Sequence, residues 1–191
     1  MVETVLALDL PSESRVVEVG VGSGCIGITL ALERPRWRVG GSDISPLALE
    51  IANENARRLG ASFALREGDL LSPFVGEVFD LVVSNPPYIE ISEALALEVR
   101  DWEPPEALFA DEDGLRFYRR LTEEAPALLE PDGWLTVEVG HTQATRVGDM
   151  LARHGWREVE TTRDLSGIER VVRARRPCWT GSRPYSARNA R

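Results

Sequence analysis

The chain has 191 residues, which is long enough for one globular domain with its own core and too short for two large domains. Of these residues 43% are hydrophobic and 28% are charged, a composition typical of a globular protein. No apolar run approaches the roughly 20 residues that cross a bilayer, and no signal peptide is visible, so we expect no membrane partner. The formal net charge is −9, and residues 173–191 hold six arginines and no acidic residue, so the rest of the chain is more acidic than the net charge suggests. An acidic body repels phosphate groups, which disfavours nucleic acid as the main partner.

Runs rich in Val, Ile and Leu alternate with segments of helical period, the pattern of βα units around a mostly parallel sheet. Seven strands are predicted, over residues 15–20, 37–43, 62–67, 79–85, 133–140, 156–162 and 169–173. Only residues 163–168 separate the last two strands, which is too short for a parallel crossover. These strands are therefore expected to form an antiparallel hairpin, so that one strand of the sheet is reversed.

Helices are predicted over residues 25–33, 46–59, 115–129 and 143–154. The segment 46–59 has Ser45 as its N-cap, Pro46 at the first helical position and Gly60 as its C-terminal cap. The predicted fold is α/β and Rossmann-like: a seven-stranded, mostly parallel sheet with one antiparallel strand and helices on both faces. Residues 1–174 form the predicted domain, and the Arg-rich residues 175–191, which lack an apolar period, are expected to be disordered.

A glycine-rich turn follows the first predicted strand and leads into helix 25–33. Glycine accepts unusual φ angles and leaves room for a ligand, while a helix N-terminus presents unpaired N–H groups. Two registers fit the spacing. Gly20, Gly22 and Gly24 suit an S-adenosylmethionine turn, whereas Gly22, Gly24 and Gly27 satisfy the dinucleotide fingerprint, with Asp43 as the acid for the ribose. The glycines alone leave both cofactors open.

Acidic residues lie in or after the first three predicted strands. Asp43 can accept hydrogen bonds from both hydroxyls of a ribose. The alternative role is that of a turn residue before a helix, where Asp is common. Glu18 lies inside a strand, where an ionised side chain is costly unless it is paired, for example with the ammonium of a bound methionine moiety. Asp69 and the backbone beside it, at Leu70, can hold an adenine ring, and a plain turn explains them comparably well. Together the acids favour a cationic sulfonium ligand over a pyrophosphate.

Asn85, Pro86, Pro87 and Tyr88 follow the apolar fourth strand. The prolines fix their own φ angles and lack N–H donors, so the carbonyl groups beside Asn85 stay able to accept hydrogen bonds from a ligand. This arrangement suits methylation of a planar NH2 group. The plain alternative is a strand that ends in a Pro-Pro turn, with Asn as a turn former.

These segments resemble class I S-adenosylmethionine-dependent methyltransferases, and more closely the release factor glutamine methyltransferase family (HemK/PrmC). The resemblance covers about residues 2–174, and it rests on residues 18–24, Asp43, Gly68 and Asp69, residues 84–89, residues 102–104 with 107–110, and residues 164–172. Members of the family carry a helical domain before the catalytic one. Here only Glu3 and Thr4 match the joining segment, so we expect a catalytic domain that binds the cofactor but recognises a whole release factor more weakly.

The resemblance implies methyl transfer from S-adenosylmethionine, without a metal, to the side-chain amide nitrogen of the glutamine in the Gly-Gly-Gln loop of peptide-chain release factors. It implies three catalytic residues: Asn85 Oδ1 and the Pro86 carbonyl grip the amide hydrogens, and Tyr88 packs against the amide plane. Pro87 joins these three as a substrate-binding residue. The implied cofactor-binding residues are Glu18, Gly20, Gly22, Gly24, Asp43, Asp69, Leu70 and Asn85.

Other functions fit parts of the pattern. The Asn-Pro-Pro-Tyr motif is shared with adenine and guanine amino-methyltransferases, so a nucleic-acid substrate stays an alternative, as does a glutamine of a ribosomal protein. A nicotinamide-dependent oxidoreductase fits the second glycine register, and a cofactor-sensing module without activity fits the missing helical domain. Cys25 and Cys178 lack metal-ligand spacing and are expected to be small buried residues in the reducing cytoplasm, with a disulfide between them as the alternative.

Overall fold

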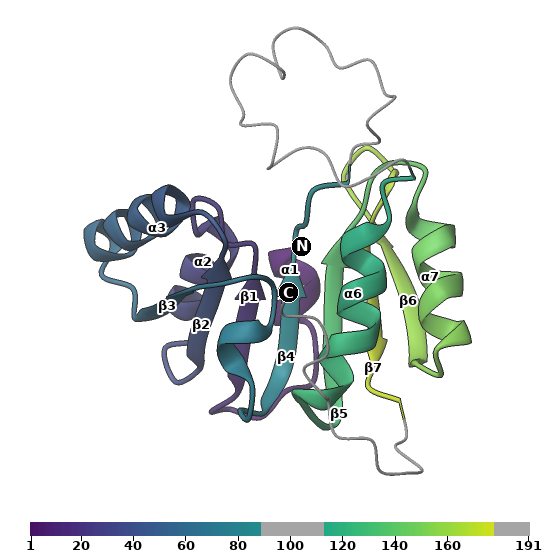
Figure 1. Cartoon of the computed structure of the whole chain (residues 1–191), viewed down its shortest axis with the longest axis horizontal. Coiled ribbons are helices and arrows are strands. Elements are labelled where there is room, and N and C mark those ends of the chain that lie inside the picture. The colour runs from purple at the N-terminus through teal and green to yellow at the C-terminus, as the bar shows by residue number, and fades with distance from the viewer. Residues whose placement is uncertain (89–112, 178–191) are drawn as a thin grey trace, which may run out of the picture.

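The structure is a computed structural model that describes residues 1–88 and 113–177. In these residues a seven-stranded sheet has the strand order β3-β2-β1-β4-β5-β7-β6 (Figure 1). β7 runs antiparallel to both of its neighbours, and the other pairs are parallel, so the predicted sheet with one reversed strand is confirmed. The strands are β1 (Arg15–Val19), β2 (Arg38–Asp43), β3 (Phe63–Glu67), β4 (Phe79–Ser84), β5 (Leu129–Glu138), β6 (Arg157–Arg163) and β7 (Glu169–Arg175).

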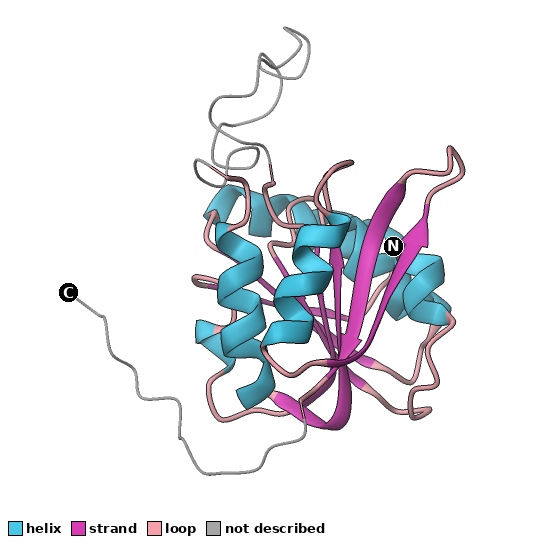
Figure 2. Cartoon of the chain, turned by 90° about the vertical axis from the view of Figure 1, so that its right-hand side faces the viewer, coloured by secondary structure: helices cyan, strands magenta, loops and turns pink. Residues whose placement is uncertain are grey.

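Helices cover both faces of the sheet (Figures 1 and 2). The α-helices are α1 (Val2–Leu6), α2 (Cys25–Glu33), α3 (Pro46–Leu59), α6 (Arg116–Glu124) and α7 (Ala144–Arg153), and the short 3-10 helices are η1 (Ser72–Phe74) and η2 (Ala125–Ala127). On one face, Val5 of α1 and Leu30 of α2 share a buried apolar cluster with Leu81 of β4. On the other face, Tyr118 of α6 and Leu151 of α7 belong to a second buried cluster. None of the described helices is long and apolar enough to span a membrane.

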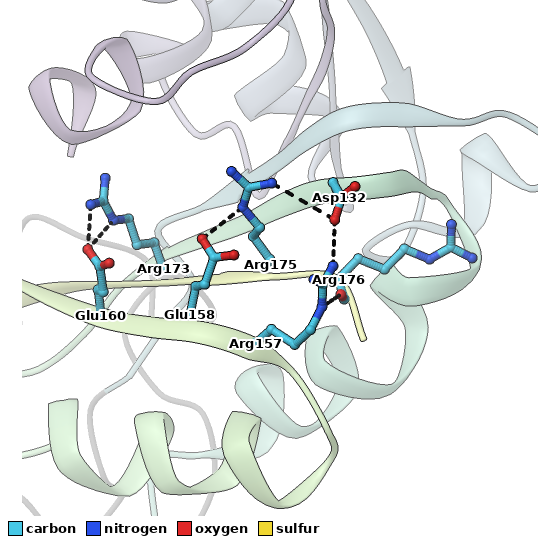
Figure 3. A network of polar contacts seen from close by, with 7 residues as sticks. All are labelled: Asp132, Arg157, Glu158, Glu160, Arg173, Arg175 and Arg176. Atoms are coloured by element: carbon cyan, nitrogen blue, oxygen red, sulfur yellow. Dashed lines mark hydrogen bonds and ion pairs between the residues drawn. The ribbon is translucent and has the colours of Figure 1, made fainter. Parts of the chain in front are cut away.

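The part of the sheet formed by β5, β7 and β6 carries charged side chains on the face turned away from α6 and α7 (Figure 3). The guanidinium carbons of Arg173 and Arg175 lie 5.5 and 4.7 Å from the centre of the Trp134 ring. Arg173 pairs with Glu160, and Arg175 pairs with Glu158. The stacked guanidinium groups help to cover Trp134, which is only 5% exposed.

The predicted helices 25–33 and 46–59 match α2 and α3 in both bounds. The expected caps of α3 are present, because Ser45 Oγ accepts a hydrogen bond from Ala48 N and Gly60 adopts a φ of 69°. The helix predicted over 115–129 is too long: α6 stops at Glu124 and η2 follows. Pro126 lies within η2 and lacks the N–H that would continue the α-helical pattern.

The start of β5 and one short helix also differ from the prediction. β5 begins at Leu129 rather than at residue 133, since Leu129 pairs with Phe79 across a register shift in the sheet. The short helix α1 was not predicted. Of the tail 175–191 that is expected to be disordered, only residues 175–177 are described; Arg175 ends β7, and Arg176 N donates to Gly133 O. Residues 178–191 and the family segments at 89, 102–104 and 107–110 lie outside the described residues, so the boundary at residue 174 stays a prediction.

Candidate active site

The carboxyl ends of β1, β2 and β4 meet at one edge of the sheet, where several predicted site residues lie. Val19 of β1 is in register with Ser42 of β2 and with Ser84 of β4. Ser84 Oγ donates to Val19 O at 2.8 Å, and Gly20 N donates to Ser42 O at 2.8 Å. These bonds bring Asn85, the residue after Ser84, beside the start of the glycine-rich turn.

Gly20 and Gly22 have a backbone conformation that favours glycine, and the space beside them is open. Their φ angles are 71° and 52°, and a Cβ built on either residue would meet no atom within 4 Å. Gly24 serves a different purpose. With a φ of 79°, its Cβ would lie 2.9 Å from Ile28 Cδ1 and 3.1 Å from Ala52 Cβ, so this glycine closes the turn against α2 and α3. The open side of the turn is therefore at Gly20 and Gly22, as expected where a ligand approaches the backbone.

Asp43 holds the glycine-rich turn from the neighbouring strand. Its Oδ2 accepts a hydrogen bond from Gly22 N at 2.9 Å, and its Oδ1 accepts one from Ser45 N at 2.9 Å. The side chain is partly exposed. Each carboxylate oxygen has a second lone pair, so both can still accept a hydroxyl donor. The turn role of Asp43 is present in the structure, and the ribose role stays a prediction.

Glu18 is a buried carboxyl group under the N-terminus of α2. Its side chain is 1% exposed, and its Oε2 accepts a hydrogen bond from Gly27 N at 2.8 Å. Burial raises the pKa of Glu18 to about 8; the Gly27 N–H opposes this shift, and the nearby charge of Asp43 adds to it. A Cβ on Gly27 would lie 2.6 Å from Glu18 Oε2 and 2.5 Å from Phe63 Cζ. Close packing of α2 on β1 and β3 thus explains Gly27. The third glycine of the dinucleotide fingerprint serves the same kind of packing, so Gly27 does not separate the two registers.

Asp69 and Leu70 lie in the turn after β3. The Asp69 side chain is half-exposed, and its Oδ1 lies 2.9 Å from Nη1 of Arg120 on α6, a pairing that the sequence did not predict. Leu70 has a φ of 49°, its side chain is buried in the core, and its carbonyl accepts a hydrogen bond from Ser42 Oγ at 2.6 Å. A ligand at this turn can therefore reach Leu70 only through its backbone.

The four residues after β4 differ in exposure. Asn85 is exposed, Pro86 is buried, and Pro87 and Tyr88 are partly buried. The Tyr88 side chain packs against the core cluster under α6 and α7, and its carbonyl accepts a hydrogen bond from Gln143 Nε2 at 2.8 Å. The exposed Asn85 thus lies in the sequence between two residues that are held by hydrogen bonds, Ser84 before it and Tyr88 after it. The sequence predicted Gln143 only as the start of a helix; its single local signal is its place three residues after Gly140 at the end of a strand.

A hollow of about 400 Å³ lies elsewhere, near the amino ends of β1 and β2, where Leu10, Arg34 and Trp37 are among its lining residues. No predicted site residue lines it, so it is separate from the candidate active site. Cys25 is exposed at the start of α2, which corrects the expectation that it is buried. Within residues 1–88 and 113–177, His, Cys, Asp and Glu side chains form no group of three that could hold a metal ion.

Comparison with known proteins identifies the family. The model of the methyltransferase small domain matches residues 3–99. The solved structure of the release-factor-specific protein-(glutamine-N5) methyltransferase from Alicyclobacillus acidocaldarius is 31% identical in sequence, with a TM-score of 0.56, and the match covers 93% of this chain and 90% of that chain. This chain belongs to the release factor glutamine methyltransferase family. The family and the class I methyltransferase fold predicted from the sequence are confirmed.

Two curated members of the family, both named release factor glutamine methyltransferase, illustrate the extent of the match. The relative from Geobacter sulfurreducens is 47% identical over 167 residues, which cover 86% of this chain and 59% of the relative. The relative from Koribacter versatilis is 43% identical over 182 residues, which cover 93% of this chain and 64% of the relative. The chain spans about three fifths of the length of these family members.

Proposed function

We propose that this chain transfers a methyl group from S-adenosylmethionine to the side-chain amide nitrogen of the glutamine in the Gly-Gly-Gln loop of peptide-chain release factors. The observation that carries the proposal is the position of Asn85. Its exposed carboxamide follows β4 directly and lies beside the turn whose open side is at Gly20 and Gly22. Membership of the release factor glutamine methyltransferase family supports the choice of substrate.

The proposed chemistry follows from the weakness of an amide as a nucleophile, since its nitrogen lone pair is delocalised into the carbonyl. Asn85 Oδ1 and the Pro86 carbonyl each accept one amide hydrogen, which aims the lone pair out of the amide plane, while Tyr88 packs against that plane. These contacts strengthen as positive charge develops on the nitrogen, so they act by position and electrostatics. As the N–C bond forms, the C–S bond of the donor breaks, and the nitrogen afterwards gives its proton to water.

The residues at the strand ends fit S-adenosylmethionine, which supplies a methyl group on positively charged sulfur. Asp43 has acceptor capacity for ribose hydroxyls, and Asp69 with the backbone of Leu70 lies at the turn proposed for the adenine. Glu18 is a buried carboxyl with a raised pKa, which a cationic ammonium group nearby would lower. Gly20 and Gly22 leave the backbone open to the ligand.

The charge of the chain supports a protein substrate. Before residue 173, 16 basic residues stand against 31 acidic ones, so the body repels phosphate backbones. Release factors act in translation, which takes place in the cytoplasm, and we place the reaction there.

Incubation of the chain with a labelled methyl donor and a purified release factor tests the proposal. The expected result is label on the glutamine of the Gly-Gly-Gln loop, located by peptide mass spectrometry. A release factor with alanine at that position is the matched control and should stay unlabelled. A synthetic Gly-Gly-Gln peptide, ribosomal proteins and RNA are offered in parallel. Label on RNA or ribosomal proteins alone would contradict the proposed substrate.

A further inference from the structure

The carboxamide of Gln143 joins segments that are far apart in the sequence. Its Nε2 donates to Tyr88 O at 2.8 Å and to Gly114 O at 3.3 Å. Its Oε1 accepts a hydrogen bond from Gly140 N at 3.1 Å. The residue is only 4% exposed, so these bonds are made away from water. Gln143 thus connects the residues that follow β4, the residues that precede α6 and the turn before α7.

The surroundings of Gln143 are closely fitted to its side chain. A Cβ on Gly140 would lie 3.0 Å from Gln143 Oε1 and 3.2 Å from Tyr88 Cδ2, so both side chains pack directly on this glycine. The hydroxyl of Tyr118 donates to Glu138 O at 2.9 Å and lies 3.4 Å from Gln143 Oε1. The carboxamide therefore sits in a buried polar pocket whose size suits it.

We propose that Gln143 is a positioning residue for methyl transfer, because it fixes the Tyr88 carbonyl and thereby the direction of Asn85. Only Pro86 and Pro87 separate these two residues, and their rings restrict the backbone between them. On the other side of Asn85, the hydroxyl of Ser84 is bonded to Val19 O at 2.8 Å. Asn85 is thus held from both directions. The inference rests on the proposed function, since the direction of Asn85 matters only if Asn85 grips the reacting amide.

A carboxamide of this length meets all the requirements of the pocket. Its two N–H donors match the carbonyls of Tyr88 and Gly114, and its oxygen matches Gly140 N. A glutamate has the same shape and keeps the acceptor for Gly140, but when ionised it loses both donors and turns a negative charge toward two carbonyl oxygens. Gln143→Glu therefore removes the hydrogen bonds to Tyr88 and Gly114 and keeps the hydrogen bond from Gly140.

The test compares Gln143→Glu with the wild-type chain, using a synthetic Gly-Gly-Gln peptide as substrate. We expect kcat per cofactor-binding site to fall about 10- to 100-fold above neutral pH, since misplacement by about 1 Å can cost that much. The Kd for S-adenosylmethionine, measured by calorimetry, should stay within about twofold. At lower pH the carboxyl gains an O–H donor, so the ratio of variant to wild-type kcat should rise. A residue that only supports folding would change the fraction of binding-competent chains and leave kcat per site intact.

Thr142→Glu is the matched control, because Thr142 is exposed beside Gln143 and the change adds the same charge without removing the carboxamide. It should leave kcat and its pH profile as in the wild type. Gly140→Ala is the second variant should Gln143→Glu not fold; its methyl group presses on Gln143 and Tyr88, and it should also lower kcat without changing cofactor affinity. Normal kcat in a folded variant of either kind would overturn the role of Gln143 and leave the proposed function standing. A wild-type chain that binds cofactor but labels neither peptide nor release factor would overturn the proposed function and this role with it.

Discussion

The candidate site has two ends that are held in different ways: the proposed cofactor end, around the glycine-rich turn at Gly20 and Gly22, and the proposed acceptor end, around Asn85. At the cofactor end, two carboxyl groups accept hydrogen bonds from backbone N–H groups of the same β1-α2-β2 unit: Asp43 from Gly22, and Glu18 from Gly27. At the acceptor end, the contact that fixes Tyr88 comes from Gln143, a residue 55 positions along the chain. One end is therefore organised by a single βαβ unit, and the other depends on the packing of β4, α6 and α7.

This difference predicts a division of labour. Substitutions in the β1-α2-β2 unit should change the affinity for the cofactor, because its hydrogen-bonding groups are arranged around the glycine-rich turn. Substitutions near Asn85 should change turnover, because they alter the direction of the acceptor groups and leave the turn intact.

Replacement of Asn85 should have the largest effect on turnover and should leave cofactor affinity unchanged. Asn85→Ala removes an acceptor that strengthens in the transition state, so we expect kcat to fall by about 10²- to 10³-fold. The Kd for S-adenosylmethionine should stay within about twofold, because the lost bonds are to the reacting amide. Single-turnover kinetics with the Gly-Gly-Gln peptide, together with calorimetry, provides both numbers.

Asn85→Asp is the matched control, since it keeps an acceptor oxygen at the same distance from the backbone. Its kcat should lie between those of the wild type and Asn85→Ala. A large increase in the cofactor Kd in both variants would show that Asn85 belongs to the cofactor end instead.

Replacement of Asp43 tests the opposite end. Asp43→Ala leaves Gly22 N and Ser45 N without their acceptor and removes the group proposed for the ribose, so cofactor binding should weaken by about 1–3 kcal/mol. At saturating cofactor, kcat should recover to within a few fold. Calorimetric titration measures the affinity, and Asp43→Asn, which keeps one oxygen, should show a smaller loss. If Asp43→Ala lowered the saturated kcat as much as Asn85→Ala does, the two ends would not be separable.

Glu18 gives the cofactor end a pH dependence. The pKa of Glu18 is raised to about 8 from its ordinary value of 4.5, chiefly by burial, so the folded chain holds the proton more tightly than the unfolded chain. The associated stabilisation is complete below pH 4.5 and is lost as the pH rises towards 8. Gln at this position does not titrate, so the unfolding free energy of Glu18→Gln relative to the wild type should increase across that range and then level off.

Thermal or urea unfolding at a series of pH values measures this difference, and Glu123→Gln, at an exposed position of α6, is the control without a buried carboxyl. Cofactor binding near neutral pH should also release protons from the wild-type chain, because a cation beside Glu18 lowers its pKa. Calorimetry in buffers of different ionisation enthalpy detects this release. Equal release from Glu18→Gln would show that Glu18 does not face the cationic group.

The sequence predicted the elements around the glycine-rich turn better than the contacts behind Asn85, and the reason is physical. Glycines with positive φ angles, the Ser45 cap and the Gly60 stop are local signals, which is why the bounds of α2 and α3 were right. The family motifs then located Asn85 and its neighbours. The contact between Gln143 and Tyr88 is different: the one local signal of Gln143 is its place three residues after Gly140, and that place does not tell which distant carbonyl the side chain reaches.

Other misses have the same origin. Arg120 pairs with Asp69 only because α6 packs over the turn after β3. β5 starts early because Leu129 finds Phe79 on the neighbouring strand. In each case the partner is chosen by tertiary packing, whereas periodicity and capping report only on the nearest few residues.

The smallest expected effect lies away from both ends, on the charged face of β6 and β7 (Figure 3). Arg173 Nη2 and Glu160 Oε2 are 2.5 Å apart, with side chains 23% and 55% exposed. Exposed ion pairs contribute roughly 0.2–1 kcal/mol, so Glu160→Gln should lower the free energy of unfolding by no more than this, and by less at high salt. Arg173→Ala should cost more, because it also uncovers the ring of Trp134.

Neither change should alter the cofactor Kd or kcat, which makes this pair the reference for the other variants. The face is built from β-strand side chains that point away from α6 and α7, whereas Gln143 and Tyr88 belong to the side of the sheet that those helices cover. A fall in kcat in Glu160→Gln, at unchanged cofactor affinity, would mean that the acceptor end responds to strain from across the sheet. The positioning of Asn85 would then depend on the whole β5-β7-β6 region and not on Ser84 and Gln143 alone.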